Sequence, residues 1–201
     1  MAHLNEIVDP SLARELEQAG TEGKADVLFA YMERRGQSFY DEAVTQLEHA
    51  LQCANEARLS GADDVLVTGA LLHDLGHFLV DEGNEKADFL TEDLLHEEVG
   101  AEYLKPFFID AVTEAVGLHV PAKRYICTVE RDYYQTLSRA SKRSFELQAG
   151  FMSDAEKAAF EANPHWESAV QLRKWDDLAK VKGLETPGLE SYRGAVQGCL
   201  K

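Results

Sequence analysis

Four histidines recur at nearly constant intervals through the middle of the chain. His49, His73, His96 and His119 are separated by 24, 23 and 23 residues. Each interval is about one helix plus a turn, so imidazoles from four successive helices can converge at the centre of a bundle. Asp74 follows His73 directly, and imidazoles together with carboxylates suit Fe, Mn or Zn. The spacing therefore predicts a metal site.

The pair His73 and Asp74 lies in the apolar run GALLHDLGHFL, residues 69–79. Neighbouring residues on a helix point about 100° apart, so these two side chains meet at one site most easily when Asp74 bridges two ions. The alternative is that each histidine is a hydrogen-bonded core residue, which requires a separate buried polar partner for every one of the four. We therefore expect a dinuclear centre. His3 and His165 are assigned to surface or packing roles.

The elements that must position these residues are helices. Apolar residues recur with helical periodicity, and patterns of alternating residues typical of strands are absent, so the fold class is predicted to be all-α. Gly36 and Gly61 are suited to helix C-termini and end the first two helices predicted below, and Pro106 lies in the first turn of the fifth. Helices are predicted over residues 25–36, 42–61, 62–79, 94–105, 106–119, 153–163 and 164–181.

Composition limits the possible functions. With 201 residues, of which 45% are hydrophobic, the chain is predicted to form one domain with a real core. Its net charge of −16 repels phosphate backbones and anionic lipids, so neither nucleic acid nor a membrane is expected as a partner. Three cysteines without a C-x-x-C motif fit a reducing cytoplasm, and no signal peptide or long apolar run is found. An anionic substrate would need a local cluster of basic residues.

The histidine pattern resembles the HD-domain superfamily, in which a first His is followed by His-Asp and a late Asp. Here these match His49, then His73 with Asp74, then an aspartate in LRKWDDLAK. His96 and His119 resemble the two additional ligands of dinuclear members. Over residues 38–180 the chain resembles, more narrowly, the HD-domain diiron oxygenases that cleave the C–P bond of 1-hydroxy-2-aminoethylphosphonates. The resemblance implies an HD-domain helical bundle, with residues 1–201 as a single domain.

The same resemblance implies a cofactor and its ligands. The cofactor would be two Fe ions in the Fe(II)/Fe(III) mixed-valent state, with O2 as co-substrate. Asp176 is preferred to Asp177 because its spacing from His119 fits the family and because Arg173 shares its helical face. Asp74 would bridge both irons. The six implied ligands are His49, His73, Asp74, His96, His119 and Asp176.

Further residues match positions that contact substrate in such oxygenases. His77 and Lys123 would act on the substrate, although His77 could instead be a packed core imidazole and Lys123 a solvated charge. The phosphonate would be bound by Ser141 and Ser144, in the segment SRASKRSF, together with Arg173. This segment supplies the local basic and hydroxyl groups that an anion requires, although it could instead be a solvated basic loop.

The segment GQSFYDEAVTQLEH resembles the part of the family that precedes the first ligand. Glu42 matches a glutamate near the substrate. The tyrosine of the family aligns with Phe39 in this chain. If the alignment is shifted by one residue, Tyr40 would be a placeholder ligand, which coordinates the metals until substrate binds. Aromatic rings and a carboxylate suit a quaternary ammonium group, so the N-trimethylated substrate is preferred to the free amine. The products would be glycine betaine, or glycine, and phosphate.

Two other functions remain open from the sequence. The first is a dinuclear metal-dependent HD phosphohydrolase, in which a metal-bound hydroxide attacks a phosphoester. The second is a non-catalytic helical binding module that keeps the metal for stability. A requirement for O2 separates oxygenation from hydrolysis. The sequence makes no prediction of oligomeric state.

Overall fold

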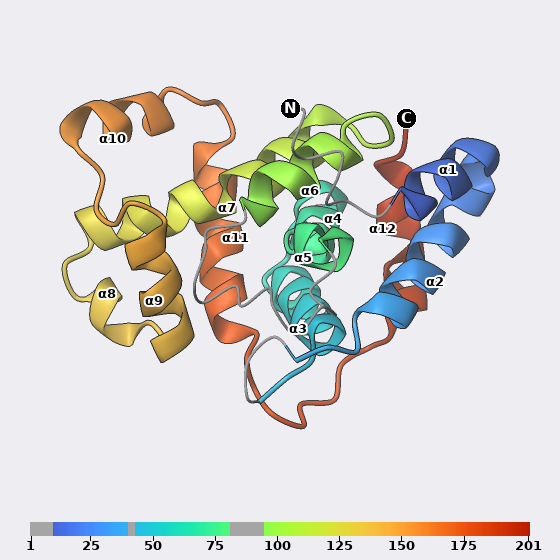
Figure 1. The fold of residues 1–201 in the computed structure, drawn as a ribbon, viewed down its shortest axis with the longest axis horizontal. Coiled ribbons are helices and arrows are strands. Elements are labelled where there is room, and N and C mark those ends of the chain that lie inside the picture. Colours follow the sequence, from blue (N-terminus) through green and yellow to red (C-terminus); the bar gives the residue numbers. More distant parts are fainter. Residues whose placement is uncertain (1–9, 40–42, 81–94) are drawn as a thin grey trace.

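The computed structural model describes residues 10–39, 43–80 and 95–201 (Figure 1). Within these ranges the secondary structure is helical, apart from two isolated bridges that join Phe39 to Thr45 and Phe108 to Leu200. The predicted all-α class is confirmed. Among the described residues, no helix is both long enough and apolar enough to cross a membrane.

Six helices form the centre of the molecule. The long helix α7 packs against α11, α6 and α4, while α3 packs against α4 and α11, and α5 against α6 (Figure 1). Three of the central helices, α3, α7 and α11, therefore pack against α4, at whose end the His-Asp pair lies. The six are α3 (Gln46–Leu59), α4 (Asp64–Leu72), α5 (Leu75–Leu79), α6 (His96–Leu104), α7 (Asp110–Val129) and α11 (Trp166–Leu178).

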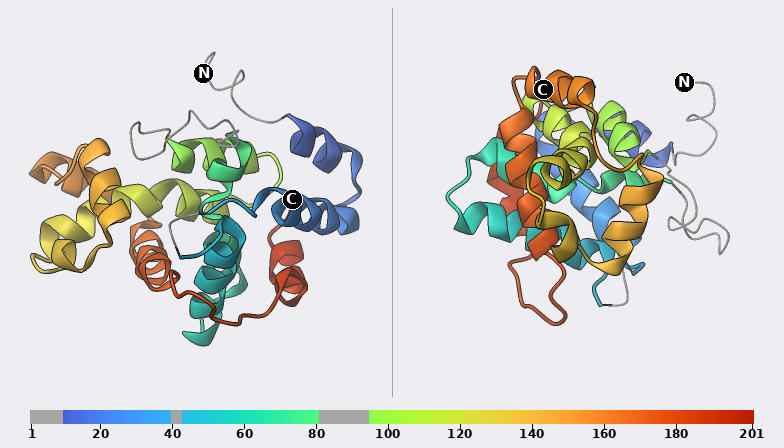
Figure 2. Two further views of the ribbon diagram at one scale, coloured as in Figure 1. Left: turned by 60° about the horizontal axis from the view of Figure 1, so that its bottom comes forward. Right: turned by 90° about the vertical axis from the view of Figure 1, so that its left-hand side faces the viewer.

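Two further groups of helices flank this centre on opposite sides (Figure 2). On one side, α2 and α12 pack on each other, α1 packs on α2, and α12 on α4. One apolar core runs through this side and the centre, from Leu12 to Cys199. The other side has smaller apolar clusters around Phe145 and Phe160. The flanking helices are α1 (Ser11–Gln18), α2 (Lys24–Arg35), α12 (Arg193–Gly198), α8 (Tyr133–Thr136), α9 (Arg139–Leu147) and α10 (Asp154–Glu161).

The segment 62–79, predicted as one helix, is divided into two. Helix α4 ends at Leu72 and α5 begins at Leu75, so His73 and Asp74 form the junction between them. Gly76 permits this arrangement, since a Cβ there would lie 1.9 Å from the carbonyl oxygen of His96. The break therefore brings the start of α6 directly against the His-Asp pair.

Helix α7 also differs from its predicted range of 106–119. It starts after Pro106, at Asp110, and continues to Val129 through Pro121. The lack of an N–H on Pro121 removes one backbone hydrogen bond but does not end the helix, because packing on α11 and α6 supports it from outside. The extension places Lys123 one turn after His119 on the same helix.

Candidate metal centre

The six predicted ligands converge at the centre of the bundle. Five separate elements supply them: α3, the α4–α5 junction, the first residue of α6, the middle of α7 and the last turns of α11. All six side chains are buried, and the most exposed of them, His96, shows 9% of its surface. They are His49, His73, Asp74, His96, His119 and Asp176.

One group of donors, which we call the His49 half, consists of His49, His73, Asp176 and Oδ2 of Asp74. The Nε2 atoms of His49 and His73 are 3.2 Å apart, and Oδ2 of Asp74 lies 3.3 Å from each. Oδ1 of Asp176 is also 3.3 Å from Nε2 of His49. Four side chains thus direct nitrogen or oxygen atoms toward one point.

The second group, which we call the His96 half, consists of His96, His119 and Oδ1 of Asp74. The two Nε2 atoms are 3.1 Å apart, and each lies 3.4 Å from Oδ1 of Asp74. The two oxygens of a single carboxylate therefore face two separate pairs of imidazoles. This is the arrangement expected of a carboxylate that bridges two metal ions.

Backbone carbonyls determine which imidazole nitrogens carry protons. A carbonyl only accepts, so Nδ1 is the donor where His49 contacts Ala179 at 2.7 Å, His73 contacts Ala70 at 2.9 Å and His119 contacts Val116 at 2.7 Å. When these rings are neutral, their Nε2 atoms carry lone pairs. The facing Nε2 atoms of His49 and His73 then cannot hydrogen-bond to each other. Such imidazoles, oriented through Nδ1, are ready to bind a cation.

The carboxylates support the same conclusion. Oδ2 of Asp74 and Oδ1 of Asp176 are buried and accept no hydrogen bond from the described residues. Burial opposes ionisation, but His73 lowers the pKa of Asp74, and Arg173 and Lys180 lower the pKa of Asp176, in both cases well below the usual value. Such burial is costly unless a cation lies close, and the Lys180 ammonium, 3.3 Å from Oδ1 of Asp176, supplies this for one of the two oxygens. The residues present therefore fit two metal ions.

The pKa of His73 is shifted in the opposite direction from those of His96 and His119. Burial lowers the pKa of His96 and of His119, so these rings are neutral, as ligands must be. For His73 burial acts in the same direction, but the Asp74 carboxylate outweighs it and raises the pKa well above the usual value. The Asp74 carboxylate thus favours a positive charge at the position of His73.

His77 lies beside the His96 half. Its ring stacks on that of His96, with ring centroids 3.9 Å apart and an interplanar angle of 18°. Asp74, His77 and His96 each have one possible metal-binding atom, and these three atoms lie within 4.8 Å of one another. The structure thus places His77 next to a predicted metal position, and its role toward substrate stays a prediction.

Lys123 is buried, with 3% of its surface exposed, which excludes the alternative of a solvated charge. Its ammonium group donates to Oγ of Ser144 at 2.8 Å. Burial, assisted by the neighbouring charges of Arg173 and Lys180, lowers the pKa of Lys123 to about 7. Ser141 is buried as well, and it lies at the start of α9 on the same side as Ser144.

The guanidinium of Arg173, which was predicted to bind the phosphonate, contacts side chains of the protein. Its guanidinium donates to Asp176 and to Asp177, and its Nε donates to the hydroxyl of Tyr133 at 3.3 Å. The Tyr133 hydroxyl in turn donates to Asp177. Of the two adjacent aspartates, Asp176 reaches the imidazoles, while Asp177 lies in the network around Arg173.

Sequence reasoning missed several residues of this region. Lys180 lies one turn after Asp176, with its ammonium 3.3 Å from the Asp176 carboxylate and 3.4 Å from Oγ of Ser141. Glu97 is buried, with Oε2 at 3.5 Å from Nδ1 of His96. A basic residue four positions after a predicted ligand and an acidic residue beside another were signals in the sequence. Tyr133 gave no such signal.

The segment predicted to contact the substrate amine is only partly described. Tyr40 and Glu42 lie outside the described residues. Phe39 is described, pairs with Thr45 through an isolated bridge and is exposed. The predicted roles of these residues therefore stay predictions.

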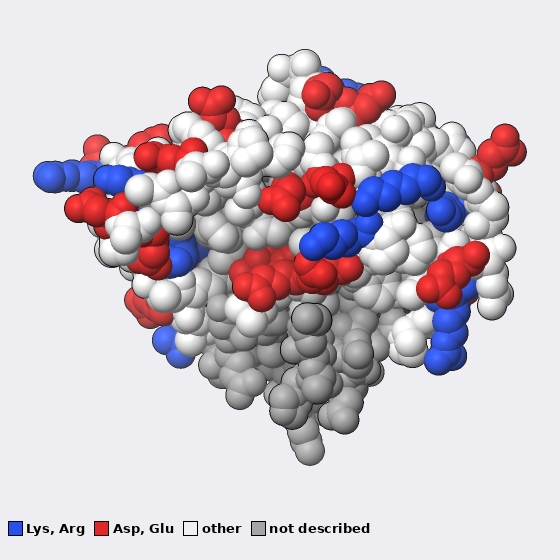
Figure 3. Space-filling model, turned by 90° about the horizontal axis from the view of Figure 1, so that it is seen from above, with Lys and Arg blue, Asp and Glu red and all other residues white. Residues whose placement is uncertain are grey.

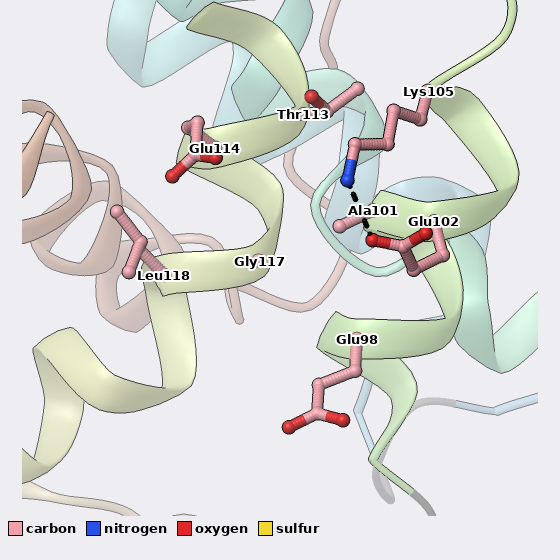
Figure 4. A pocket seen from close by; sticks show the side chains of 8 residues that line it. All are labelled: Glu98, Ala101, Glu102, Lys105, Thr113, Glu114, Gly117 and Leu118. Carbon is pink, nitrogen blue, oxygen red and sulfur yellow. Dashed lines mark hydrogen bonds and ion pairs between the residues drawn. The ribbon is translucent and has the colours of Figure 1, made fainter. Parts of the chain in front are cut away.

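The surface near the metal centre carries a second, separate feature. Carboxylates gather in the middle of the face shown in Figure 3, consistent with the net charge of −16. A pocket between α6 and α7 is lined by Glu98, Glu102 and Glu114 together with Lys105, which donates to Glu102 at 2.9 Å (Figure 4). These carboxylates repel an anion. The basic side chains nearest the predicted ligands in the described chain are instead Lys123, Arg173 and Lys180.

Comparisons with known proteins agree with this geometry. The family model described as "HD domain" matches residues 46–161. The chain is 56% identical to a hydroxymethylphosphonate dioxygenase of Gimesia maris over 98% of its own length and 99% of that protein. It is 42% identical to the [1-hydroxy-2-(trimethylamino)ethyl]phosphonate dioxygenase (glycine-betaine-forming) of Leisingera caerulea, over 82% of this chain and 84% of that protein. An uncharacterized protein of Acanthamoeba polyphaga mimivirus is 31% identical over 83% of this chain and 77% of that protein.

Proposed function

Since this chain belongs to the HD domain family, we propose that it is a dioxygenase that uses two iron ions to cleave the carbon–phosphorus bond of a 1-hydroxyphosphonate. One observation carries the proposal. The carboxylate of Asp74 faces two separate pairs of imidazoles, and the buried ammonium of Lys123 lies one turn along α7 from one of them. The two relatives with assigned activities, at 56% and 42% identity, are both named as dioxygenases of hydroxyphosphonates.

The cofactor of the proposal is a mixed-valent Fe(II)/Fe(III) pair. All its protein ligands are nitrogen or oxygen donors, and the three cysteines are buried as free thiols, which suits iron that must also bind hard oxygen ligands. When bound, the pair would accept the hydroxyl and phosphonate oxygens of the substrate as chelating ligands and would activate O2. The ligands are the six residues of the His49 and His96 halves.

The residues of this chain have separate tasks in the proposal. Lys123 and the hydroxyls of Ser141 and Ser144 bind the phosphonate, where burial strengthens their electrostatic attraction. His77, beside His96, contacts the substrate near its hydroxyl group and holds or moves a proton there. Arg173 supports this region through Asp176.

The overall reaction balances without another reductant. For a substrate R–CH(OH)–PO3²⁻, one O2 gives R–COO⁻, HPO4²⁻ and H⁺. The C–P bond and the C1–H bond break, and O2 accepts all four electrons. Hydroxymethylphosphonate would give formate, and the trimethylated substrate would give glycine betaine.

The substituent at C1 defines the substrate within this class. The relative with 56% identity is named for hydroxymethylphosphonate, which has no amine, while the sequence-based preference is the N-trimethylated compound. Turnover of hydroxymethylphosphonate, the free-amine compound and the trimethylated compound, compared as kcat/KM, identifies the substrate. A strong preference for the free amine would overturn the sequence-based choice.

The proposal extends to the arrangement and location of the chain. It takes residues 1–201 as one domain, supported by a core that joins α1 to α12. The substrate is a small molecule, and the acidic surface does not favour nucleic acid or anionic lipid as a partner. A cytoplasmic location is supported by three buried free cysteines.

The test is phosphate release with and without O2. The iron-loaded protein is incubated with each hydroxyphosphonate, and phosphate and O2 consumption are measured together. We expect one phosphate per O2 in air and none under strict anaerobiosis. Anaerobic phosphate release from a phosphoester would identify a phosphohydrolase, and iron binding without turnover of any of these compounds would identify a binding module.

A further inference from the structure

The guanidinium of Arg173 is already engaged by protein oxygens. Both terminal nitrogens donate to carboxylates, of Asp176 and Asp177, and Nε donates to Tyr133. The side chain is 4% exposed. The donors of this guanidinium are thus directed at protein acceptors rather than at a substrate. The contacts instead hold the Asp176 carboxylate in place, as a planar guanidinium does well.

The ammonium of Lys180 is held less tightly. Its Nζ is 3.3 Å from Oδ1 of Asp176, 3.4 Å from Oδ1 of Asp177 and 3.4 Å from Oγ of Ser141. Hydrogen bonds between an ammonium and a carboxylate are usually about 2.7–2.9 Å long. Each of these three distances is longer than that, so these three contacts can give way to a stronger acceptor.

The two lysines are placed alike relative to the metal centre. Lys123 follows His119 by four residues on α7, and Lys180 follows Asp176 by four residues at the end of α11. Lys123 is thus one helical turn from a predicted ligand on α7. Lys180 lies two residues past the end of α11, with its ammonium 3.3 Å from the carboxylate of the predicted ligand Asp176. The ligand His119 belongs to the His96 half and Asp176 to the His49 half.

Both lysines also meet the same face of α9. Nζ of Lys123 donates to Ser144, and Nζ of Lys180 contacts Ser141, three residues earlier on that helix. Residues three apart on a helix lie on one side. The two ammonium groups and two hydroxyls thus gather beside the metal centre, contributed by α7, the end of α11 and α9.

We propose that Lys180 is a second phosphonate-binding residue, paired with Lys123, and that Arg173 is a positioning residue that acts through Asp176. This inference rests on the proposed function, because it assumes an anionic substrate at this centre. It assigns substrate affinity to the two lysines and retention of iron to the arginine.

The test separates affinity from iron retention. Binding of hydroxymethylphosphonate and of inorganic phosphate to the iron-loaded protein is measured by anaerobic calorimetry, so that no turnover occurs. Lys180→Ala should bind both about 10- to 100-fold more weakly, the usual range for a charge-assisted hydrogen bond, and keep the iron content of the unsubstituted protein. Lys180→Arg should recover part of the affinity. Arg173→Lys should lose iron, since a lysine does not hold two carboxylates.

Lys174→Ala is the matched control. Lys174 lies on α11, near the surface, and pairs with Glu130 at 3.5 Å, so its loss should leave affinity and iron content unchanged. Unchanged affinity in Lys180→Ala, or loss of iron from that variant, would overturn the inference. If inorganic phosphate binds in a Lys180-dependent way but no hydroxyphosphonate is oxidised, the inference stands and the proposed function fails.

Discussion

The two halves of the metal centre differ in how many donors the protein supplies and in how these are held. The His49 half has four donors, and both its imidazoles are tied to backbone carbonyls. The His96 half has three, and Nδ1 of His96 faces the Glu97 side chain rather than a carbonyl. A metal ion with fewer protein ligands keeps more positions for exogenous ligands. In the proposed function, the His49 half would therefore hold its ion more tightly, and the His96 half would leave more positions for exogenous ligands.

Loss of the shared carboxylate should have the largest effect, because Asp74 belongs to both halves. Asp74→Asn should release both irons and lower kcat/KM at least about 1000-fold, since several kcal/mol of metal binding are lost. Iron per chain and kcat/KM are the measurements, with melting temperature as the check on folding. Asp132→Asn, at an exposed position, is the control. Two irons retained in Asp74→Asn would show that the halves do not depend on a bridge.

Substitution of His77 should have the next largest effect and should change turnover rather than iron content. His77→Ala removes a ring stacked on His96 but no predicted ligand. We expect kcat to fall about 100-fold, the lower range for loss of a group that transfers a proton, with two irons per chain retained. Loss of iron from this variant would instead make His77 a ligand of the His96 half.

Glu97 should have a smaller effect, confined to the His96 half. Glu97→Gln removes the charge that faces Nδ1 of His96, and loss of such a partner usually weakens metal binding about 10-fold. Competition with a chelator should release the first iron more easily from the variant, while the second iron is released as before. Glu98→Gln, exposed on the next position of α6, is the control. Equal release of both irons would contradict a separate role for the two halves.

The smallest effect expected is on the pH dependence. Burial lowers the pKa of Lys123 to about 7, and only its charged form attracts a phosphonate. In free enzyme kcat/KM should therefore fall as pH rises through about 7, by several-fold. Lys123→Arg stays charged and should lack this component, whereas titration of the substrate itself is common to both proteins. The same fall in both proteins would exclude Lys123 as its cause.

The convergence of the four histidines could be predicted from the sequence because each lies about one helix plus a turn after the previous one, whereas the late aspartate came from the family resemblance. The regular intervals between His49 and His119 depend only on helix length and turns. The break at Leu72–Leu75 could not be predicted, since it depends on the contact of Gly76 with the backbone of His96, which is distant in the sequence. For the same reason the periodicity of 62–79 gave one helix rather than two.

The arrangement of the basic side chains beside the predicted ligands was only partly predictable. Lys123 was found through the resemblance, but whether it was buried or solvated depended on α9 packing over α7. Lys180 was missed because its role depends on Ser141, 39 residues away. Arg173 was assigned to the substrate through the resemblance, and its place on the helical face of Asp176 was expected, whereas its contacts with Asp177 and Tyr133 are visible only in the structure.

The most direct test of the central claim is electron paramagnetic resonance of the iron-loaded, partly oxidised protein. If Asp74 bridges two irons, the Fe(II)/Fe(III) pair gives one coupled signal, which changes on addition of a hydroxyphosphonate and is absent from Asp74→Asn. Protein that holds two irons per chain but shows only the signal of isolated Fe(III) would contradict the account.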